Sequence, residues 1–125
     1  MRLLLDTHVL LWWLDDPTQI SEEAISAVQN PENAVYVSAA TAWEIVIKKA
    51  LGKLDAPDNL GEALDDCRFS TLSVTIEHAQ AIRELPIHHH DPFDRMLVAQ
   101  TKVEGLTIVT RDSEILRYPV PHLPA

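Results

Sequence analysis

Four acidic residues are placed, relative to the predicted strands and helices, so that their carboxylates could meet at one edge of a folded domain. They are Asp6, Glu44, Asp94 and Asp112. Asp6 follows the apolar residues 3–5, and Asp112 follows the β-branched stretch 106–110. Both stretches have the composition of buried strands, and ligands of open parallel sheets gather beyond the carboxyl ends of the strands. Carboxylates gathered there repel one another and raise one another's pKa, whereas Mg²⁺ or Mn²⁺ removes that repulsion.

The other two acids are placed by predicted helices. Glu44 is the one acid in the almost wholly apolar segment 39–47, so it must face either a wet cleft or a buried partner. Asp94 lies in the first turn of a helix predicted to start at Pro92, with Asp91 as its N-cap. Helices that follow strands begin at the same edge of the sheet, so all four carboxylates could converge there.

Each of these acids also has a purely structural alternative. Asp6 could do no more than cap the helix that follows it, and Asp112 could serve a turn or a cap. Asp94 is favoured by the helix dipole at any helix N-terminus. Glu44 could pair with Lys48, which lies one helical turn further along.

Short apolar runs alternate with amphipathic segments along the whole chain, which favours a single α/β domain over residues 1–125. Its central sheet is predicted to be mostly parallel, with about four or five strands. The predicted strands are residues 2–5, 34–37, 71–74, 106–110 and 120–123. The predicted helices are residues 9–14, a segment from residue 22, 39–50, 60–67, 76–85, 92–104 and a short one at 113–116.

Charge and cysteine content narrow the class of protein further. The net charge of −9 argues against a simple phosphate-binding protein with a basic face. It does not exclude a nucleic-acid enzyme whose acids bind metal ions, and it could equally suit a cationic partner. The single Cys67 cannot form an internal disulfide. No apolar stretch approaches the ~20 residues that span a membrane, and the first residues are unlike a secretion signal. We therefore expect a cytoplasmic protein with no membrane partner.

Four segments of the chain, in order and at fitting distances, resemble PIN-domain ribonucleases, and most of all the VapC-type toxins of prokaryotic toxin–antitoxin modules. They are residues 3–8 (LLLDTH), 43–45 (WEI), 91–100 (DPFDRMLVAQ) and 108–112 (IVTRD). The resemblance covers essentially the whole chain and implies a PIN-like three-layer α/β/α sandwich. It also implies that the four acids form the catalytic, metal-binding quartet of a Mg²⁺- or Mn²⁺-dependent ribonuclease. Such an enzyme hydrolyses phosphodiester bonds of RNA, and we expect a cognate VapB-like antitoxin and a homodimer.

Four further residues border the acids in sequence. Thr7 and Thr110 could hydrogen-bond the metal ligands or a metal-bound water, or could be ordinary hydroxyls at strand ends. Arg95 and Arg111 could hold phosphates through two hydrogen bonds each, or could pair with neighbouring acids.

The histidines and tryptophans support weaker predictions. His88, His89 and His90 cannot all face one ion because they are consecutive, so we expect hydrated loop residues. Trp12, Trp13 and Trp43 lie in amphipathic helices, where aromatic residues belong to a core or an interface more often than to an RNA-stacking surface. We expect Trp12 or Trp13 on a partner surface.

Two rival functions remain to be weighed. A receiver-like Mg²⁺-binding signalling domain needs paired acids after its first strand and a lysine after a late strand, where this chain has Thr7 and Arg111. A non-catalytic PIN domain that only binds RNA or protein would show the loss of a quartet acid, and none is lost here. The ribonuclease interpretation is therefore favoured.

Overall fold

The computed structural model describes residues 1–125, and a parallel sheet of five strands forms its centre. The strands are β1 (Arg2–Leu5), β2 (Ala34–Ser38), β3 (Ser70–Leu72), β4 (Thr107–Thr110) and β5 (His122–Pro124). Their order across the sheet is β3-β2-β1-β4-β5, and every neighbouring pair is parallel. Leu4 of the central strand β1 lies opposite Tyr36 of β2 and Ile108 of β4. The predicted α/β class with a parallel sheet is confirmed.

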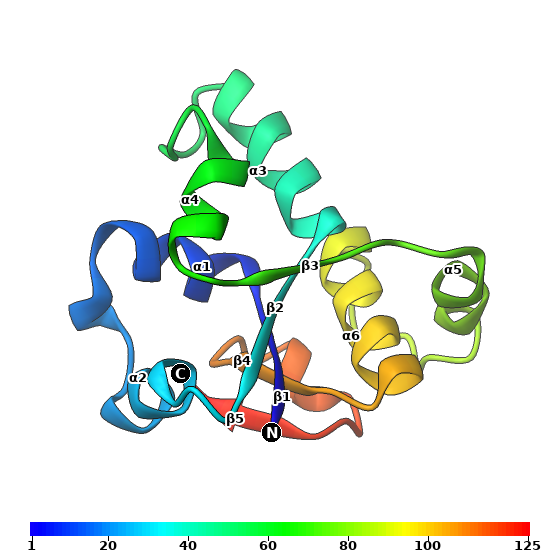
Figure 1. The fold of residues 1–125 in the computed structure, drawn as a ribbon. Coiled ribbons are helices and arrows are strands. Elements are labelled where there is room, and N and C mark those ends of the chain that lie inside the picture. The colour runs from blue at the N-terminus through cyan, green and yellow to red at the C-terminus, as the bar shows by residue number, and fades with distance from the viewer.

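Six α-helices and two 3-10 turns surround this sheet. They are α1 (Thr7–Asp15), η1 (Pro17–Gln19), α2 (Glu22–Gln29), α3 (Ala39–Ala50), α4 (Leu60–Asp66), α5 (Ile76–Ile82), α6 (Pro92–Glu104) and η2 (Ile115–Arg117). Figure 1 shows α1, α2 and α4 on one side of the sheet, and α5 and α6 on the other. None of these helices combines the length and the apolar composition that crossing a bilayer requires.

The central strand separates two apolar cores. Leu3 and Leu5 belong to a core shared with α1, α2 and β2, whereas Leu4 belongs to a second core shared with α6 and β4. All three leucines are fully buried because side chains alternate between the two faces of a strand and helices cover both faces here. The predicted three-layer sandwich is thus confirmed.

Several predicted boundaries shift by a few residues. The helix predicted over 76–85 ends at Ile82, and a turn follows before Pro86, because a proline disfavours helical backbone in the residue before it. The outer strands β3 and β5 are displaced by one or two residues, and the helix predicted at 113–116 is the single turn η2. The first helix starts at Thr7 rather than at residue 9, because Asp6 caps it.

The parallel topology fixes which chain segments share one edge of the sheet. Because β1, β2 and β4 run in the same direction, the segments that follow them, which begin at Asp6, Ala39 and Arg111, emerge at the same edge. Helix α6 ends at Glu104, shortly before β4, and is capped by Gly105, whose left-handed backbone (φ 66°) suits glycine. It therefore runs back across the sheet, so its N-terminus at Pro92 also lies at that edge.

Candidate functional site

Asp6 lies buried between the end of β1 and the start of α1. Its side chain caps α1, since Oδ1 accepts a hydrogen bond from the backbone N–H of Val9 at 2.8 Å. Its other oxygen, Oδ2, accepts a hydrogen bond from the Thr110 hydroxyl, and the two oxygens are 2.5 Å apart. The pKa of Asp6 is raised above its usual value, mainly by burial and in part by the charge of Asp112. The two hydrogen bonds and the nearby His8 act in the opposite direction. Asp6 is therefore both a helix cap and part of the carboxylate group at the sheet edge.

Glu44 is the acid of α3, and only 3% of its surface is exposed. The hydroxyl of Thr7 donates to Oε1 at 2.7 Å, and the Lys48 ammonium donates to Oε2 at 2.7 Å. The pairing with Lys48 that the sequence left open is thus present. The hydrogen bond to Glu44 raises the pKa of Lys48 above its usual value, and the charges of Asp91 and Asp94 raise it as well. Lys48 is therefore the cation that borders the carboxylate group.

Asp94 occupies the third position of α6, and Asp91 caps that helix. Oδ1 of Asp91 accepts hydrogen bonds from the backbone N–H groups of Phe93 at 2.9 Å and Asp94 at 3.0 Å. Asp94 therefore does not cap the helix. Its side chain instead accepts a hydrogen bond from His89 Nε2 at 3.3 Å.

The pKa of Asp94 is raised from 3.8 to about 6. Burial is the largest cause, and the charges of Asp91, Asp112 and Glu44 act in the same direction, whereas the hydrogen bond from His89 opposes them. The charges of Asp112 and Glu44 thus act on Asp94, as carboxylates at one edge of the sheet should.

Asp112 follows β4 and organises the turn after it. Its Oδ1 accepts hydrogen bonds from the backbone N–H groups of Glu114 at 2.8 Å and Ile115 at 3.4 Å. Its own backbone N–H donates to the Thr110 hydroxyl at 3.0 Å. The turn-forming alternative is present, and the charge of Asp112 also reaches Asp6 and Asp94.

The four carboxylates suit a hard divalent cation by chemistry, because they are oxygen ligands that repel one another at one sheet edge. In the arrangement seen here, however, no group of three or more histidine, cysteine, aspartate or glutamate side chains is placed to hold a metal ion. Instead, Thr110 holds Asp6, Thr7 and Lys48 hold Glu44, and His89 holds Asp94. A cation bound by three of these acids therefore requires side-chain rotations from this arrangement.

The two arginines are committed to other contacts. Arg95 donates to the carbonyl oxygens of Pro86 at 2.9 Å and Ile82 at 3.3 Å, and to the hydroxyl of Tyr118 at 3.0 Å. Arg111 donates to the carbonyl of Gln19 at 2.8 Å, and its guanidinium lies 4.0 Å from the centre of the Trp12 ring. Neither arginine forms an ion pair, in contrast to the alternative that each pairs with a neighbouring acid.

One histidine differs from expectation, and the tryptophans differ from one another in burial. His89 is not a hydrated loop residue, because only 15% of its side chain is exposed and both ring nitrogens have partners. Trp12 and Trp13 are half-buried against the core that α1 and α2 share with β2, whereas 64% of Trp43 is exposed. Sequence reasoning did not place His89 at this site, and it named Lys48 only as a possible partner of Glu44.

Comparison with known protein families identifies the class to which this chain belongs. The PIN domain family matches residues 3–121. The chain belongs to the PIN domain family, as the four segments predicted.

Particular relatives are also similar to this chain. The ribonuclease VapC22 of Mycobacterium tuberculosis is 28% identical over an alignment of 129 positions, which includes 95% of each chain. The ribonuclease VapC16 of the same organism is 37% identical over 59 residues, or 46% of this chain and 42% of that one.

Solved structures show the same fold. A chain of VapBC2 from Rickettsia felis, bound to a DNA fragment from the promoter, aligns with a TM-score of 0.73 and 16% identity over 100% of this chain and 99% of that chain. DNA-bound VapBC from Salmonella typhimurium gives a TM-score of 0.73 at 19% identity, over 99% and 98% of the two chains. FitAcB from Neisseria gonorrhoeae gives 0.66 at 24% identity, over 97% and 96%.

Proposed function

We propose that this chain is a metal-dependent endoribonuclease and the toxin of a toxin–antitoxin pair. The observation that carries the proposal is the gathering of four acids at one sheet edge, where the charges of Asp112 and Glu44 help to raise the pKa of Asp94. Membership of the PIN domain family and similarity to two VapC ribonucleases support RNA as the substrate.

In this proposal Asp6, Glu44, Asp94 and Asp112 hold Mg²⁺, or Mn²⁺ in its place. When bound, the metal ion activates water and neutralises charge that develops on the scissile phosphate. Thr110 and Thr7 orient the carboxylates of Asp6 and Glu44 by donating hydrogen bonds to them. Lys48 offsets part of the negative charge of the acids before a cation arrives.

The arginines contribute unequally to the binding of substrate phosphate. Arg111 adjoins Asp112, is exposed and has a single hydrogen-bonded acceptor, so it is the better placed of the two to meet a phosphate. Arg95 already donates to three acceptors and is half-buried. We therefore assign Arg95 chiefly to the support of the loop before α6.

Induced expression tests this function directly in cells. Wild-type protein should stop growth and leave new RNA ends, whereas Asp6→Asn should do neither, because it removes a carboxylate from the site. Asp65→Asn, which changes an exposed acid of α4 by the same chemistry, is the matched control and should behave like the wild type. Identical RNA ends in the wild-type and Asp6→Asn cultures would count against the proposal.

The partner in this proposal is a VapB-like antitoxin, and the pair acts in the cytoplasm, where RNA is found. Two observations support this partner: the net charge of −9 suits a cationic segment, and the structures aligned above include VapBC complexes. A lysine- or arginine-bearing segment that covers the four carboxylates would exclude RNA from them. Purified toxin should therefore lose its cleavage activity when the antitoxin is added, and high salt should weaken the complex.

A further inference from the structure

We propose that His89 is a positioning residue for Asp94, and that Tyr118 and Arg95 fix the orientation and the tautomer of its ring. This inference rests on the proposed function in one respect, namely that Asp94 binds the metal ion. The four residues form one hydrogen-bonded chain that ends on a single oxygen of the Asp94 carboxylate.

The geometry of the chain is continuous from Arg95 to Asp94. Arg95 Nη1 lies 3.0 Å from the Tyr118 hydroxyl, which lies 2.9 Å from Nδ1 of His89. Nε2 of His89 lies 3.3 Å from Oδ2 of Asp94. The other Asp94 oxygen, Oδ1, accepts no hydrogen bond from the protein, and 18% of the Asp94 side chain is exposed.

The direction of each hydrogen bond follows from the donors and acceptors. A guanidinium can only donate, so the Tyr118 oxygen accepts a hydrogen bond from Arg95, which leaves the Tyr118 O–H to donate a hydrogen bond to His89. Nδ1 of His89 then accepts, and a neutral imidazole with an accepting Nδ1 carries its proton on Nε2. Nε2–H is therefore the group that donates to Asp94. Tyr118 thus selects the tautomer of His89 that holds the Asp94 carboxylate.

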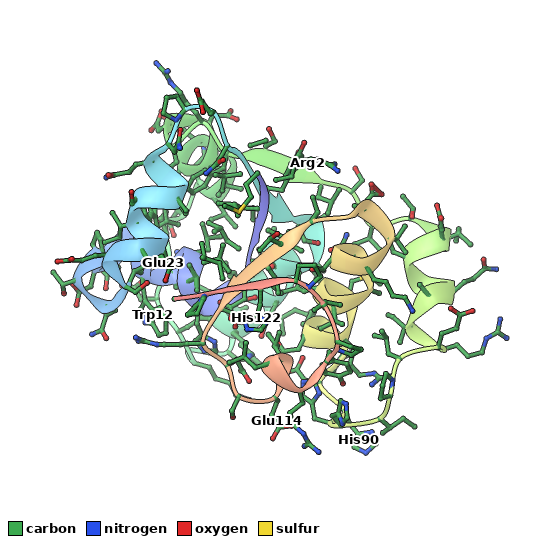
Figure 2. The ribbon with its side chains drawn as sticks, turned by 90° about the horizontal axis from the view of Figure 1, so that it is seen from below. Arg2, Trp12, Glu23, His90, Glu114 and His122 are labelled. Atoms are coloured by element: carbon green, nitrogen blue, oxygen red, sulfur yellow. The ribbon has the colours of Figure 1, made fainter.

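The surroundings hold this chain firmly. Only 3% of Tyr118 is exposed, and it packs in the core beneath α6. Arg117 donates to the carbonyl of His88 at 3.2 Å, and the His88 ring meets the Tyr118 ring edge-on with centroids 4.9 Å apart. Figure 2 shows His90, from the same loop, and Glu114, from the segment after β4, at the same margin of the molecule.

Asp6 and Glu44, the two buried acids of the site, also accept hydrogen bonds from neighbouring side chains. Thr110 donates to one oxygen of Asp6, and Thr7 donates to one oxygen of Glu44. Partners of this kind orient metal-binding carboxylates, and their removal typically lowers metal affinity or activity by about 10–100-fold. We therefore expect loss of the His89 side chain to weaken Mn²⁺ binding within this range.

The test compares four substitutions in the hydrogen-bonded chain with two controls, on the purified protein. His89→Ala removes the donor, His89→Gln restores an N–H at a similar reach, and Tyr118→Phe removes only the hydroxyl. Asp94→Asn removes the negative charge and one of the two carboxylate oxygens. The controls are His90→Ala, an exposed neighbour in the same loop, and Tyr36→Phe, which removes the other tyrosine hydroxyl of the chain. Mn²⁺ affinity is measured from the free-ion EPR signal, and the His89 tautomer from ¹⁵N NMR of the metal-free protein.

The expected result has three parts. Wild-type His89 shows the Nε2–H tautomer, and Tyr118→Phe shifts it towards a mixture. His89→Ala binds Mn²⁺ about 10–100-fold more weakly, His89→Gln recovers part of that loss, and Tyr118→Phe falls between wild type and His89→Ala. Both controls match the wild type, and thermal melts show that all variants fold.

Two outcomes overturn the inference. In the first, His89→Ala and Tyr118→Phe are folded and bind Mn²⁺ as tightly as the wild type, whereas Asp94→Asn binds it more weakly. The second is an Nδ1–H tautomer in the wild type. Failure of the proposed function looks different, because wild-type protein and Asp94→Asn would then bind Mn²⁺ equally and the wild type would not cleave RNA.

Discussion

Asp94 is the residue whose ionisation most clearly reflects its surroundings. Its pKa rises from 3.8 to about 6 because the site is buried and other carboxylates are near. The folded state therefore holds this proton more tightly than the unfolded state, so the free energy of unfolding should fall as pH rises from about 4 to about 6. At most roughly 3 kcal/mol is lost in this way, since one pKa unit corresponds to about 1.4 kcal/mol.

This account predicts a specific behaviour for Asp94→Asn in the metal-free protein. The substitution removes the charge that the site disfavours, so the variant should be at least as stable as the wild type at pH 7 and should lose less stability between pH 4 and pH 6. Denaturant unfolding at several pH values measures both quantities. A wild-type protein that gains stability over this interval, with Asp94→Asn following it in parallel, would contradict the assigned pKa shift. The same variant should have lost RNA cleavage.

At the scale of elements, the start of α6 separates a capping acid, Asp91, from Asp94, the acid proposed to bind the metal ion. Asp91→Ala removes hydrogen bonds to the backbone N–H groups of Phe93 and Asp94, so it should cost about 0.5–2 kcal/mol of stability. Cleavage should largely persist, because the carboxylate of Asp91 is occupied by the helix. Thermal melts and a cleavage assay on Asp91→Ala and Asp94→Asn test the distinction. An inactive, fully stable Asp91→Ala beside an active Asp94→Asn would show that the two roles are reversed.

The sequence was sufficient for features that depend on neighbouring residues. Asp91 before Pro92 gave the cap of α6, and the apolar stretches before Asp6 and Asp112 gave β1 and β4. Strand boundaries at the sheet edges shifted because short, proline-flanked strands such as β5 are defined by pairing with β4 rather than by their own composition.

The support around the acids could not be predicted in the same way. His89 meets Tyr118 across 29 positions of sequence, and three consecutive histidines offer no local sign of which one turns inward. Only the folded chain, which packs the loop before α6 against the segment after β4, makes that choice. The bond between Lys48 and Glu44 was visible as a spacing, but the position of Lys48 beside Asp91 and Asp94 was not.

At the scale of the whole molecule, one apolar face is left uncovered. An apolar groove of about 470 Å³ is lined mainly by residues of α3 and α6, among them Trp43, Phe93 and Met96, and nearby Val46 is 61% exposed. Contiguous apolar surface of this kind usually marks an interface. We propose that it lies between the two copies of the expected homodimer.

Light scattering of wild type and Trp43→Glu tests this interface. Wild type should have the mass of a dimer at micromolar concentration, and Trp43→Glu should shift it towards the monomer, because a charge would be buried in an apolar contact. Leu51→Glu, which changes an equally exposed apolar residue just beyond the end of α3, is the control and should remain dimeric. A monomeric wild type, or a dimer that Trp43→Glu leaves intact, argues against this face.

The most direct test of the central claim is cleavage of RNA by purified, antitoxin-free protein in defined metal conditions. Cleavage of a total cellular RNA preparation should require Mg²⁺ or Mn²⁺, stop when EDTA is added and resume when the metal is restored. Asp6→Asn, purified in the same way, should be inactive throughout, and Asp65→Asn should match the wild type. Cleavage that continues undiminished in EDTA, or that Asp6→Asn retains in full, would contradict a metal-dependent ribonuclease acting through these carboxylates.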